Sequence, residues 1–303
     1  MLTRRTFIAS TGALTMGIPN LLKAAPPPLA SIGLIADAQY ADVEAEKTRF
    51  YRQSVGKLGA AVEHLNRQEL ACCLHLGDLI DRQWRSFDEI LKPLATSRHR
   101  FHHLFGNHDF DVLDGFKPRV PERLGLAKRY YHVDLPGFRL LILDSTEVST
   151  YATVAGTPEH AAAAAALEKA KAAKLPQAQP WNSGLSSAQL EWFDRSCAEA
   201  AAKQLKVIAF SHHPVFPVHA LNLWNSEAVL ALVARHRHLV AWFNGHNHEG
   251  NFGIHDDVPF VNLQGMVETA DTSAFATAEL HPDRLILTGQ GREISRELVF
   301  RKA

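Results

Sequence analysis

The chain has 303 residues, of which 46% are hydrophobic and 21% are charged. This composition favours a globular fold of one large domain or two ordinary ones, and it argues against a disordered chain. The 32 basic and 32 acidic residues cancel, so the net charge gives no sign of binding to nucleic acid or to an anionic membrane surface. The 17 histidines are potential metal ligands, and the 3 cysteines are too few to indicate a disulfide framework.

Residues 1–25 are typical of an export signal. Arg4 and Arg5 precede an uncharged run from Phe7 to Leu22, an arrangement that resembles the twin-arginine signature. The run is shorter than the roughly 20 apolar residues that a membrane span needs, so we expect no stable membrane span. The segment predicts export by the twin-arginine machinery to the periplasm or the exterior. An uncleaved N-terminal helix is the alternative.

After this segment, the pattern alternates between strands and helices. Apolar runs predict strands at residues 31–36, 70–76, 101–105, 130–134, 138–143, 207–210 and 239–243, and several short strands within 258–300. Helical spacing predicts helices at 45–68, 87–94 and 158–174, and another that begins at Ser186. Because no stretch is typical of an interdomain linker, we expect residues 26–303 to form one domain with a helical insertion near 158–187. The expected fold class is α/β, an α+β sandwich of two packed mixed β-sheets flanked by helices.

Polar clusters follow directly after five of the apolar runs. They are Asp37-Ala38-Gln39, Gly77-Asp78, Gly106-Asn107-His108-Asp109, Ser211-His212-His213-Pro214 and Gly245-His246-Asn247-His248. Residues just past the carboxyl ends of strands gather in one crevice of an α/β sheet. Their carboxylates, amides and imidazoles suit manganese, iron, zinc or magnesium, whereas a thiolate-rich structural zinc site would need cysteine. The clusters together predict a dinuclear metal site.

Each cluster alone has a simpler interpretation, since an Asp or His after a strand is often a cap or a satisfied core group. The glycines that precede Asp78, Asn107 and His246 are expected to permit tight turns. Asp109 is expected either to orient His108 or to cap a turn.

The order Asp-x-His/Gln, Gly-Asp, Gly-Asn-His, His, Gly-His-x-His resembles that of the calcineurin-like metallophosphoesterases, from about residue 30 to residue 300. Softer motifs are similar to the manganese-dependent ADP-ribose/CDP-alcohol diphosphatase branch: 35–42, Asn182-Ser183-Gly184, Leu223-Trp224-Asn225 and 263–269. The resemblance implies a metal-dependent hydrolase that cleaves the diphosphate bond of a small nucleoside diphosphate derivative. A phosphodiesterase or phosphomonoesterase of the same superfamily is the alternative, followed by a non-catalytic binding module.

The resemblance also implies a set of ligands. One metal would be held by Asp37, Gln39, Asp78 and His248, and the other by Asp78, Asn107, His212 and His246, with Asp78 as the bridge. An amide oxygen at Gln39, in place of the usual imidazole, favours a hard ion. We therefore expect two Mn²⁺ ions, with Fe, Mg or Zn as alternatives. His213 is expected to pack or form hydrogen bonds beside the ligands.

The expected mechanism uses a water that bridges the metals. Two cations about 3.5–4 Å apart lower the pKa of this water, and its hydroxide attacks phosphorus in line with the leaving oxygen. The amide of Asn107 would stabilise charge on the phosphoryl oxygens. His108 would face the substrate, and the resemblance implies that it stabilises the transition state or protonates the leaving group.

Three residues beside the motifs are weaker candidates for substrate binding: Tyr40, Trp224 and Asn225. The two aromatic rings could stack on a base, although core packing is the commoner role of an aromatic side chain. The basic residues Arg82, Arg85 and Lys117 are candidates for a second phosphate, with solvated surface as the default interpretation.

Overall fold

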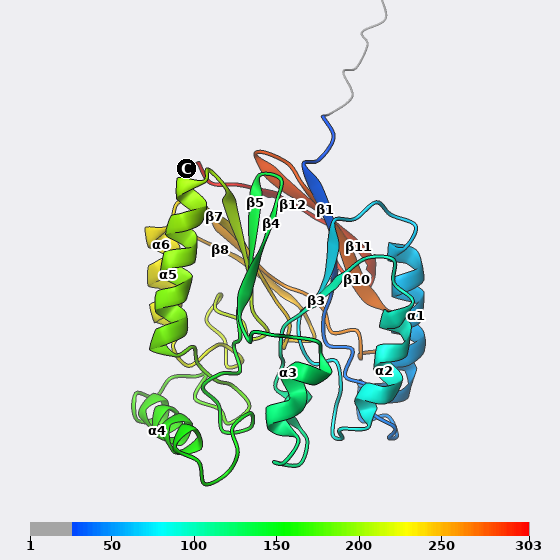
Figure 1. Cartoon of the computed structure of the whole chain (residues 1–303), viewed down its shortest axis with the longest axis vertical. Helices are drawn as coiled ribbons and strands as arrows, with labels where there is room; N and C mark the ends of the chain where they lie inside the picture. Colours follow the sequence, from blue (N-terminus) through cyan, green and yellow to red (C-terminus); the bar gives the residue numbers. More distant parts are fainter. Residues whose placement is uncertain (1–25, 303) are drawn as a thin grey trace, which may run out of the picture.

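The computed structural model describes residues 26–302, so the expected export signal lies outside the described residues. Within these residues two six-stranded sheets face each other, and helices cover their outer faces (Figure 1). The strand order is β12-β11-β10-β1-β2-β3 in the first sheet and β4-β5-β6-β7-β9-β8 in the second. Each sheet contains both parallel and antiparallel pairs, which confirms the predicted fold class.

The strands follow the predicted apolar runs closely, but β8 was not predicted from the sequence. The first sheet contains β1 (Ala30–Ile35), β2 (Cys72–His75), β3 (Phe101–His103), β10 (Ala274–Leu280), β11 (Arg284–Gly291) and β12 (Arg296–Val299). The second contains β4 (Tyr131–Leu135), β5 (Phe138–Ile142), β6 (Lys206–Phe210), β7 (Leu239–Asn244), β8 (Asn251–His255) and β9 (Val258–Asn262).

The helices lie mainly on the outer faces of the sheets. Beside the first sheet are α1 (Ser54–Leu65) and α2 (Ser86–Ala95), and beside the second are α5 (Ser187–Ala202) and α6 (Ser226–Arg235). At the lower end of Figure 1 are α3 (Val120–Arg123) and α4 (Pro158–Ala172). Short 3-10 helices are η1 (Tyr51–Gln53), η2 (His108–Phe110) and η3 (Lys117–Arg119).

Two helix predictions need correction. The predicted helix 45–68 is shorter, because Glu46 and Arg49 pair in a tight antiparallel bridge and regular helix begins only at Ser54. Helix α6 was not predicted from the sequence. By contrast, α5 begins as expected, since the side chain of Ser186 caps it by accepting a hydrogen bond from the backbone N–H of Gln189.

Three apolar clusters separate the layers. Leu34 and Phe243 belong to the core between the sheets, whereas their neighbours Ile35 and Trp242 face the helices on either side. This alternation follows from the strand geometry, in which successive side chains point to opposite faces. Both faces of the central strands are therefore buried, as their continuous apolar runs indicate.

The parallel strands bring their carboxyl ends to one edge of the molecule. Strands β1, β2 and β3 are mutually parallel in the first sheet, and β5, β6, β7 and β9 are parallel in the second. The chain enters β1 from the top of Figure 1, so the loops after these strands gather at the lower end. The predicted polar clusters lie in these loops.

Two further properties concern the described residues as a whole. Among residues 26–302 no helix has the length and apolar character needed to cross a bilayer. All three cysteines are buried and unpaired.

Buried histidines lie behind the strand ends, and we predict that they make the fold sensitive to acid. Burial lowers the pKa of His103 to about 4 from an ordinary value of 6.5. The imidazole is therefore protonated below about pH 6.5 in the unfolded chain but only below about pH 4 in the folded chain. Because the unfolded state binds more protons between these values, the free energy of unfolding falls as the pH falls from 6.5 towards 4. Between pH 7 and pH 5 this difference lowers the free energy of unfolding by about 2 kcal/mol, and the decrease on acidification should be smaller by that amount in His103→Leu. Denaturant titrations at the two pH values measure this, with His238→Leu as the control. An unchanged pH dependence in His103→Leu would contradict the prediction.

Candidate metal centre

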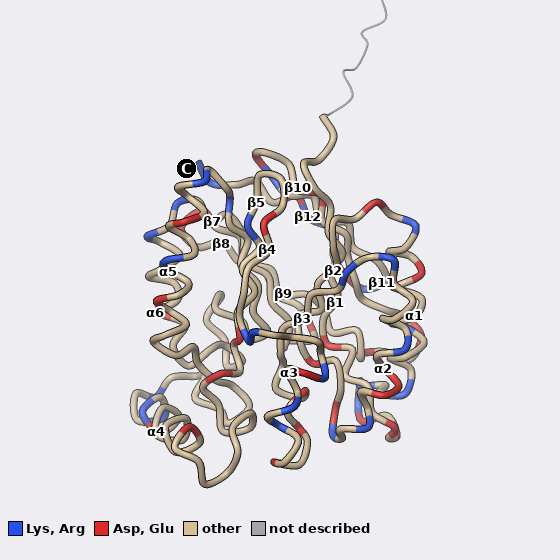
Figure 2. Tube along the Cα trace, viewed as in Figure 1, with Lys and Arg blue, Asp and Glu red and all other residues tan. Residues whose placement is uncertain are grey.

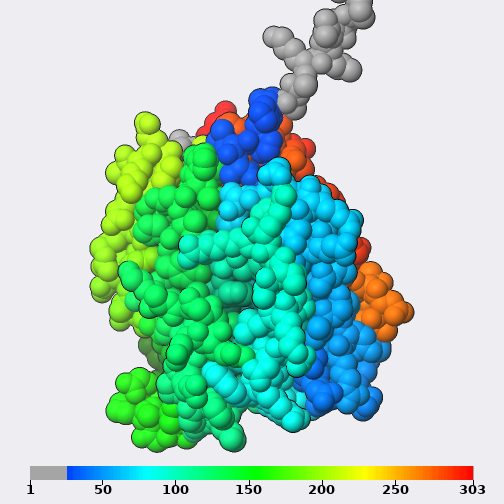
Figure 3. Space-filling model, turned by 45° about the vertical axis from the view of Figure 1, so that its right-hand side comes forward, coloured from blue at the N-terminus to red at the C-terminus, as the bar shows by residue number. Residues whose placement is uncertain are grey.

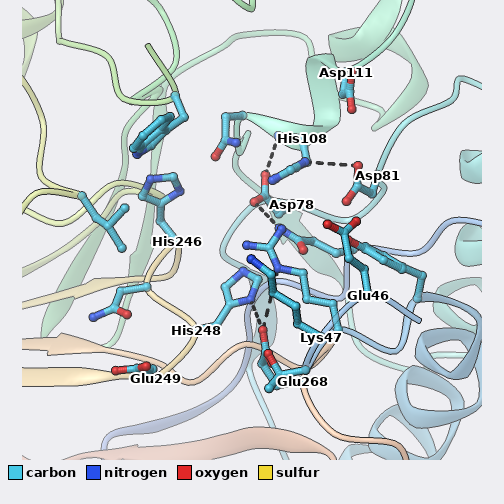
Figure 4. Close-up of a pocket in the computed structure, with 18 of the residues that line it drawn as sticks. Glu46, Lys47, Asp78, Asp81, His108, Asp111, His246, His248, Glu249 and Glu268 are labelled. Atoms are coloured by element: carbon cyan, nitrogen blue, oxygen red, sulfur yellow. Dashed lines mark hydrogen bonds and ion pairs between the residues drawn. The ribbon is translucent and has the colours of Figure 1, made fainter. Parts of the chain in front are cut away.

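The five polar clusters meet around one pocket with a volume of about 1180 Å³. Five of the predicted ligands line it directly: Gln39, Asp78, Asn107, His246 and His248. Figure 4 labels three of them, Asp78, His246 and His248. Asp37 and His212 are fully buried and lie against the others. The structure thus brings all seven predicted ligands together, although they come from loops spread over more than 200 residues of sequence.

One group of ligand atoms surrounds the imidazole of His212. Its Nε2 lies 3.2 Å from Asn107 Oδ1, 3.3 Å from Asp78 Oδ2 and 3.2 Å from His246 Nδ1. Ligand atoms about 2.0–2.2 Å from a shared ion are separated by roughly this much. Asp78 also raises the pKa of His212 to about 9 against the opposing effect of burial, and the same negative potential attracts a cation.

A second group contains Asp37, Asp78 and His248, which each offer an atom within 4.8 Å of the others. Gln39 belongs with them, because its Nε2 donates a hydrogen bond to Asp78 Oδ2 at 2.9 Å. The opposite atom of the same amide, Oε1, is buried and has no hydrogen-bond partner among the described residues. An unsatisfied buried acceptor costs about 1–3 kcal/mol, which a bound cation would offset. The donor set therefore fits two divalent ions with Asp78 shared between them.

Hydrogen bonds fix the tautomer of each of the three histidines. The backbone oxygen of Leu76 accepts from His212 Nδ1 at 2.8 Å, and Glu268 Oε1 accepts from His248 Nδ1 at 2.7 Å. Both contacts hold a proton on Nδ1, so that Nε2 is the atom that would bind a metal. Although burial opposes it, the bond from His248 lowers the pKa of Glu268 to about 2, so this acceptor is a carboxylate.

In His246 the proton is on Nε2 instead of Nδ1, and a hydrogen bond to Asn182 fixes this tautomer. Asn182 is fully buried, and its Nδ2 donates to the backbone oxygens of Gln177 at 2.9 Å and Ala220 at 2.7 Å. This orients Oδ1 towards His246, where it accepts from Nε2 at 3.1 Å. The Nδ1 atom of His246 is then the free ligand atom. The long segment after α4 therefore contributes to the metal centre through Asn182.

Backbone strain is present at four of the seven predicted ligands. Asp37, Gln39, Asp78 and His246 all have positive φ, between 43° and 70°. A left-handed conformation costs about 1–3 kcal/mol for a residue other than glycine, and such residues cluster at functional sites. These turns aim the side chains directly past the ends of their strands.

Two of the three glycines that precede predicted site residues are needed for a different reason than the sequence predicted. Neither Gly106 nor Gly245 has a positive φ. Instead, a Cβ atom on Gly106 would lie 2.1 Å from Asp78 Oδ1, and one on Gly245 would lie 2.6 Å from Asp37 Oδ2. Glycine is needed here because the carboxylates pass so close to the backbone. Only Gly77, with φ of 90°, matches the predicted conformational role.

The structure decides between the two roles expected for Asp109. Its carboxylate is fully buried and accepts from the backbone N–H groups of Gly106 at 2.9 Å, Asp78 at 3.0 Å and Leu79 at 2.9 Å. It therefore ties two motif loops together as a cap. Burial raises its pKa to about 7.

The partner of His108 is Asp81, which the sequence reasoning missed. His108 Nδ1 lies 3.2 Å from Asp81 Oδ1, as Figure 4 shows. Burial opposes protonation of His108, but Asp78 and Asp81 outweigh it and raise the pKa of the imidazole above its ordinary value. Nε2 remains available to the pocket that His108 lines.

His213 packs behind the ligands, as the sequence reasoning favoured. Its Nδ1 lies 3.0 Å from Ser145 Oγ, and its Nε2 donates to the backbone oxygen of Trp181 at 3.2 Å. Burial lowers its pKa to about 3, so the ring is neutral. Its centroid lies 4.3 Å from that of His246, which it supports from behind.

Four basic residues line the same pocket: Lys47, Arg49, Arg82 and Arg292. Arg292 Nη2 donates to the backbone oxygen of His248 at 3.3 Å, and Arg49 Nε lies 3.9 Å from Glu268 Oε1. Figure 2 shows basic and acidic residues intermixed in the loops of this end of the molecule. Arg49 and Arg292 thus lie next to His248 and Glu268, whereas Arg82 pairs with Glu46 and lies beside Asp81.

The weaker substrate candidates are not brought to this pocket. The indole of Trp224 is buried and its Nε1 donates to the backbone oxygen of Gln179 at 3.1 Å, while Asn225 bonds to the backbone of Leu185. Both line a separate cavity of about 280 Å³ beside α4. Tyr40 packs half-buried against the cluster between the first sheet and its helices. None of the three side chains lines the pocket of the metal centre, contrary to the prediction that they bind substrate there.

Among the basic candidates for a second phosphate, only Arg82 lines the pocket. Lys117 pairs instead with Asp114 Oδ1 at 2.8 Å. The sequence does contain signals for the residues that the prediction omitted. Asp81 follows Asp78 by three positions, Asn182 begins the motif Asn182-Ser183-Gly184, and Glu268 lies within the motif 263–269.

We predict that the residues behind the histidines tune the two ion sites separately. Glu268→Ala removes the acceptor of His248, and Asn182→Ala removes that of His246. Each should weaken one of two ion-binding steps about 10- to 100-fold and leave the other near its original affinity. Calorimetric titration of metal-free protein with Mn²⁺ measures both steps, and the double variant should show both losses. Glu249→Ala, which alters another carboxylate lining the pocket, is the control. If both variants weakened the same step, the assignment would be wrong.

Comparisons with known proteins agree with this geometry. The family model described as calcineurin-like phosphoesterase matches residues 31–250. A protein from Bos taurus named manganese-dependent ADP-ribose/CDP-alcohol diphosphatase is 30% identical, with 94% of this chain and 98% of that protein covered. A protein of the same name from Homo sapiens is also 30% identical, covering 94% of this chain and 96% of its own.

Among solved structures, a dimetal phosphatase from Danio rerio has a TM-score of 0.83 and 28% sequence identity. The match covers 90% of this chain and 100% of that one. The shared fold, the ligand groups at its strand ends and the match to the family model lead to one conclusion. The chain belongs to the calcineurin-like phosphoesterase family and is a metal-dependent hydrolase.

Proposed function

We propose that this protein is a manganese-dependent hydrolase that cleaves the diphosphate bond of ADP-ribose or CDP-alcohol type substrates. The observation that carries the proposal is the paired arrangement of ligand atoms around Asp78 with basic side chains next to it in one pocket. A metal pair can act on one phosphoryl group while the basic residues bind the next. The relatives that bear this activity in their names support the same substrate class.

In this proposal, Asp37, Gln39, Asp78 and His248 hold one ion, and Asp78, Asn107, His212 and His246 hold the other. When bound, the two cations supply a water of lowered pKa and neutralise charge on the phosphoryl oxygens. The oxygen-rich set around Gln39 favours Mn²⁺ over Zn²⁺. The hydrogen bonds from Leu76, Glu268 and Asn182 keep the free nitrogens of the histidines directed inwards.

The other polar side chains act on the substrate. Asn107 presents an amide that stabilises charge developing on the phosphoryl oxygens. Asp81 holds Nδ1 of His108, so that Nε2 faces the leaving oxygen. A phosphate monoester leaves readily without a proton, so for diphosphate substrates His108 acts mainly as a positive charge.

The basic side chains of the pocket support a diphosphate substrate over the alternatives. A phosphomonoester carries one phosphoryl group, which the ions alone would neutralise. A diphosphate carries a second, and the pocket offers it basic side chains, among them Arg49 and Arg292 next to His248. A cyclic-nucleotide phosphodiesterase or a phosphomonoesterase would use the same metal ligands, so these remain the competing functions. A non-catalytic module would not need His108 paired with Asp81.

The substrate panel that tests this proposal contains ADP-ribose, CDP-choline, 2′,3′-cyclic AMP and p-nitrophenyl phosphate. Purified protein loaded with Mn²⁺ should release AMP from ADP-ribose and CMP from CDP-choline, with kcat/KM at least 10-fold above the values for the other two compounds. Product chromatography measures each rate. Turnover confined to the cyclic nucleotide or the monoester would refute the diphosphatase activity.

The matched variant for the panel is His108→Ala, which retains every proposed ligand. It should bind Mn²⁺ as tightly as the unaltered protein and lose about 100-fold or more in kcat on both diphosphates. Asp78→Ala removes the shared ligand and serves as the inactive control. Unchanged turnover in His108→Ala would exclude this residue from the mechanism.

We also propose that the protein is exported by the twin-arginine machinery and acts as one domain, residues 26–303, outside the cytoplasm. The support is the sequence of residues 1–25, which lie outside the described residues. Replacement of Arg4 and Arg5 by Lys should retain active enzyme in the cytoplasm, as measured by cell fractionation. If the unaltered protein is itself found in the cytoplasm, the export proposal fails.

A further inference from the structure

Trp181 exposes a large aromatic ring inside the pocket, although the residues that follow it are buried. Its side chain is 46% exposed and lines the pocket, whereas Asn182 and Ser183 are fully buried. The segment lies between α4, which protrudes at the lower end of the molecule in Figure 3, and α5. An indole left in contact with water at a site gains from being covered by a ligand.

The backbone that carries the indole is held rigidly. The carbonyl oxygen of Trp181 accepts from His213 Nε2 at 3.2 Å. The next side chain, Asn182, bonds to Gln177, Ala220 and His246, and the hydroxyl of Ser183 donates to the backbone oxygen of Ser145. None of these bonds uses the indole. The backbone that carries the ring is therefore fixed, so only the two side-chain torsions of Trp181 remain to be ordered on binding.

The pocket is polarised between this ring and the basic residues. Trp181 is joined through His213 to the side of His246, whereas Arg292 and Arg49 adjoin His248 and Glu268. Figure 4 shows His246 and Lys47 on opposite sides of the pocket with Asp78 between them. An apolar aromatic surface thus lies beyond one ligand group, and positive charge lies beyond the other.

We propose that the indole of Trp181 is the platform on which the heteroaromatic base of the substrate stacks. The inference rests on the proposed function, since it assigns the nucleoside end of a nucleoside diphosphate to the side of His246. Stacking on an aromatic ring tolerates purines and pyrimidines alike, because every base has a π-face. A platform of this kind accommodates both adenine and cytosine without hydrogen-bonded readout.

The kinetic test compares Trp181→Ala and Trp181→Phe with the unaltered enzyme on ADP-ribose, CDP-choline and a dialkyl diphosphate that has no base. Trp181→Ala should lose about 5- to 100-fold in kcat/KM on both nucleotides, mostly through KM, and stay within 2-fold on the dialkyl compound. Trp181→Phe should retain most of the activity because it keeps an aromatic face. Both variants keep the carbonyl group that binds His213.

The control variant is Val218→Ala, which truncates an apolar side chain that is 73% exposed but does not line the pocket. It should leave all three substrates unaffected. An equal loss on nucleotides and on the dialkyl diphosphate in Trp181→Ala would overturn the platform, and so would no loss at all.

Fluorescence separates this inference from the diphosphatase proposal, because it needs no turnover. AMP should quench the tryptophan emission of the Mn²⁺-loaded protein, and the quench should be absent in Trp181→Phe. If the enzyme fails on diphosphates but this difference persists, the proposed substrate is wrong and the base platform stands. If AMP produces no quench, or the same quench in both proteins, the platform is refuted.

Discussion

The fully buried carboxylate of Asp78 is the constraint on which the rest of the site depends. Its Oδ1 accepts a hydrogen bond from the backbone of His108 at 2.8 Å, and its Oδ2 accepts from Gln39 and lies beside His212. One side chain therefore contacts residues from three other strand-end loops. Gly106 lacks a Cβ because this carboxylate occupies the space, and Asp109 caps the backbone at Asp78 itself. The two sheets must place all four loops within reach of one carboxyl group.

Such a site lowers the stability of the protein without its ions. Asp37, Asp78 and Asp109 bury three carboxylates at one end of the molecule, and burial raises the pKa of two of them, Asp37 and Asp109. The positive φ angles of the ligands add backbone strain, and Gln39 Oε1 adds an unsatisfied acceptor. Most of these costs have a common cause, since Asp37, Gln39, Asp78 and His246 each place an oxygen or nitrogen lone pair where a cation would bind, whereas Asp109 ties their loops together. The large apolar cores on either side of the sheets hold the loops in this arrangement.

The sequence predicted the parts of this molecule that depend on local pattern. Apolar runs that end in Gly-Asp or Gly-Asn-His located the strands and their polar ends, because a parallel sheet collects such ends at one edge. The same reasoning could not locate Trp181 or Arg49, since their positions depend on how long loops fold back over the sheet edge. It also misplaced Trp224, whose ring occupies a gap beside α4 that has no signature in the sequence. Helix α6 was also not predicted; it begins directly after Asn225, whose side chain bonds to the backbone of Leu185 and does not cap the helix.

The segment 181–183 contributes both to the metal centre and to the wall of the pocket. Asn182 orients the ligand histidine His246, while the indole of its neighbour Trp181 lines the pocket and the carbonyl group of Trp181 accepts a hydrogen bond from His213. A substitution that shifts this short stretch of backbone would therefore displace a ligand histidine and the wall of the pocket together. Loss of activity alone would not distinguish a defect in metal binding from a defect in substrate binding for any variant of this segment.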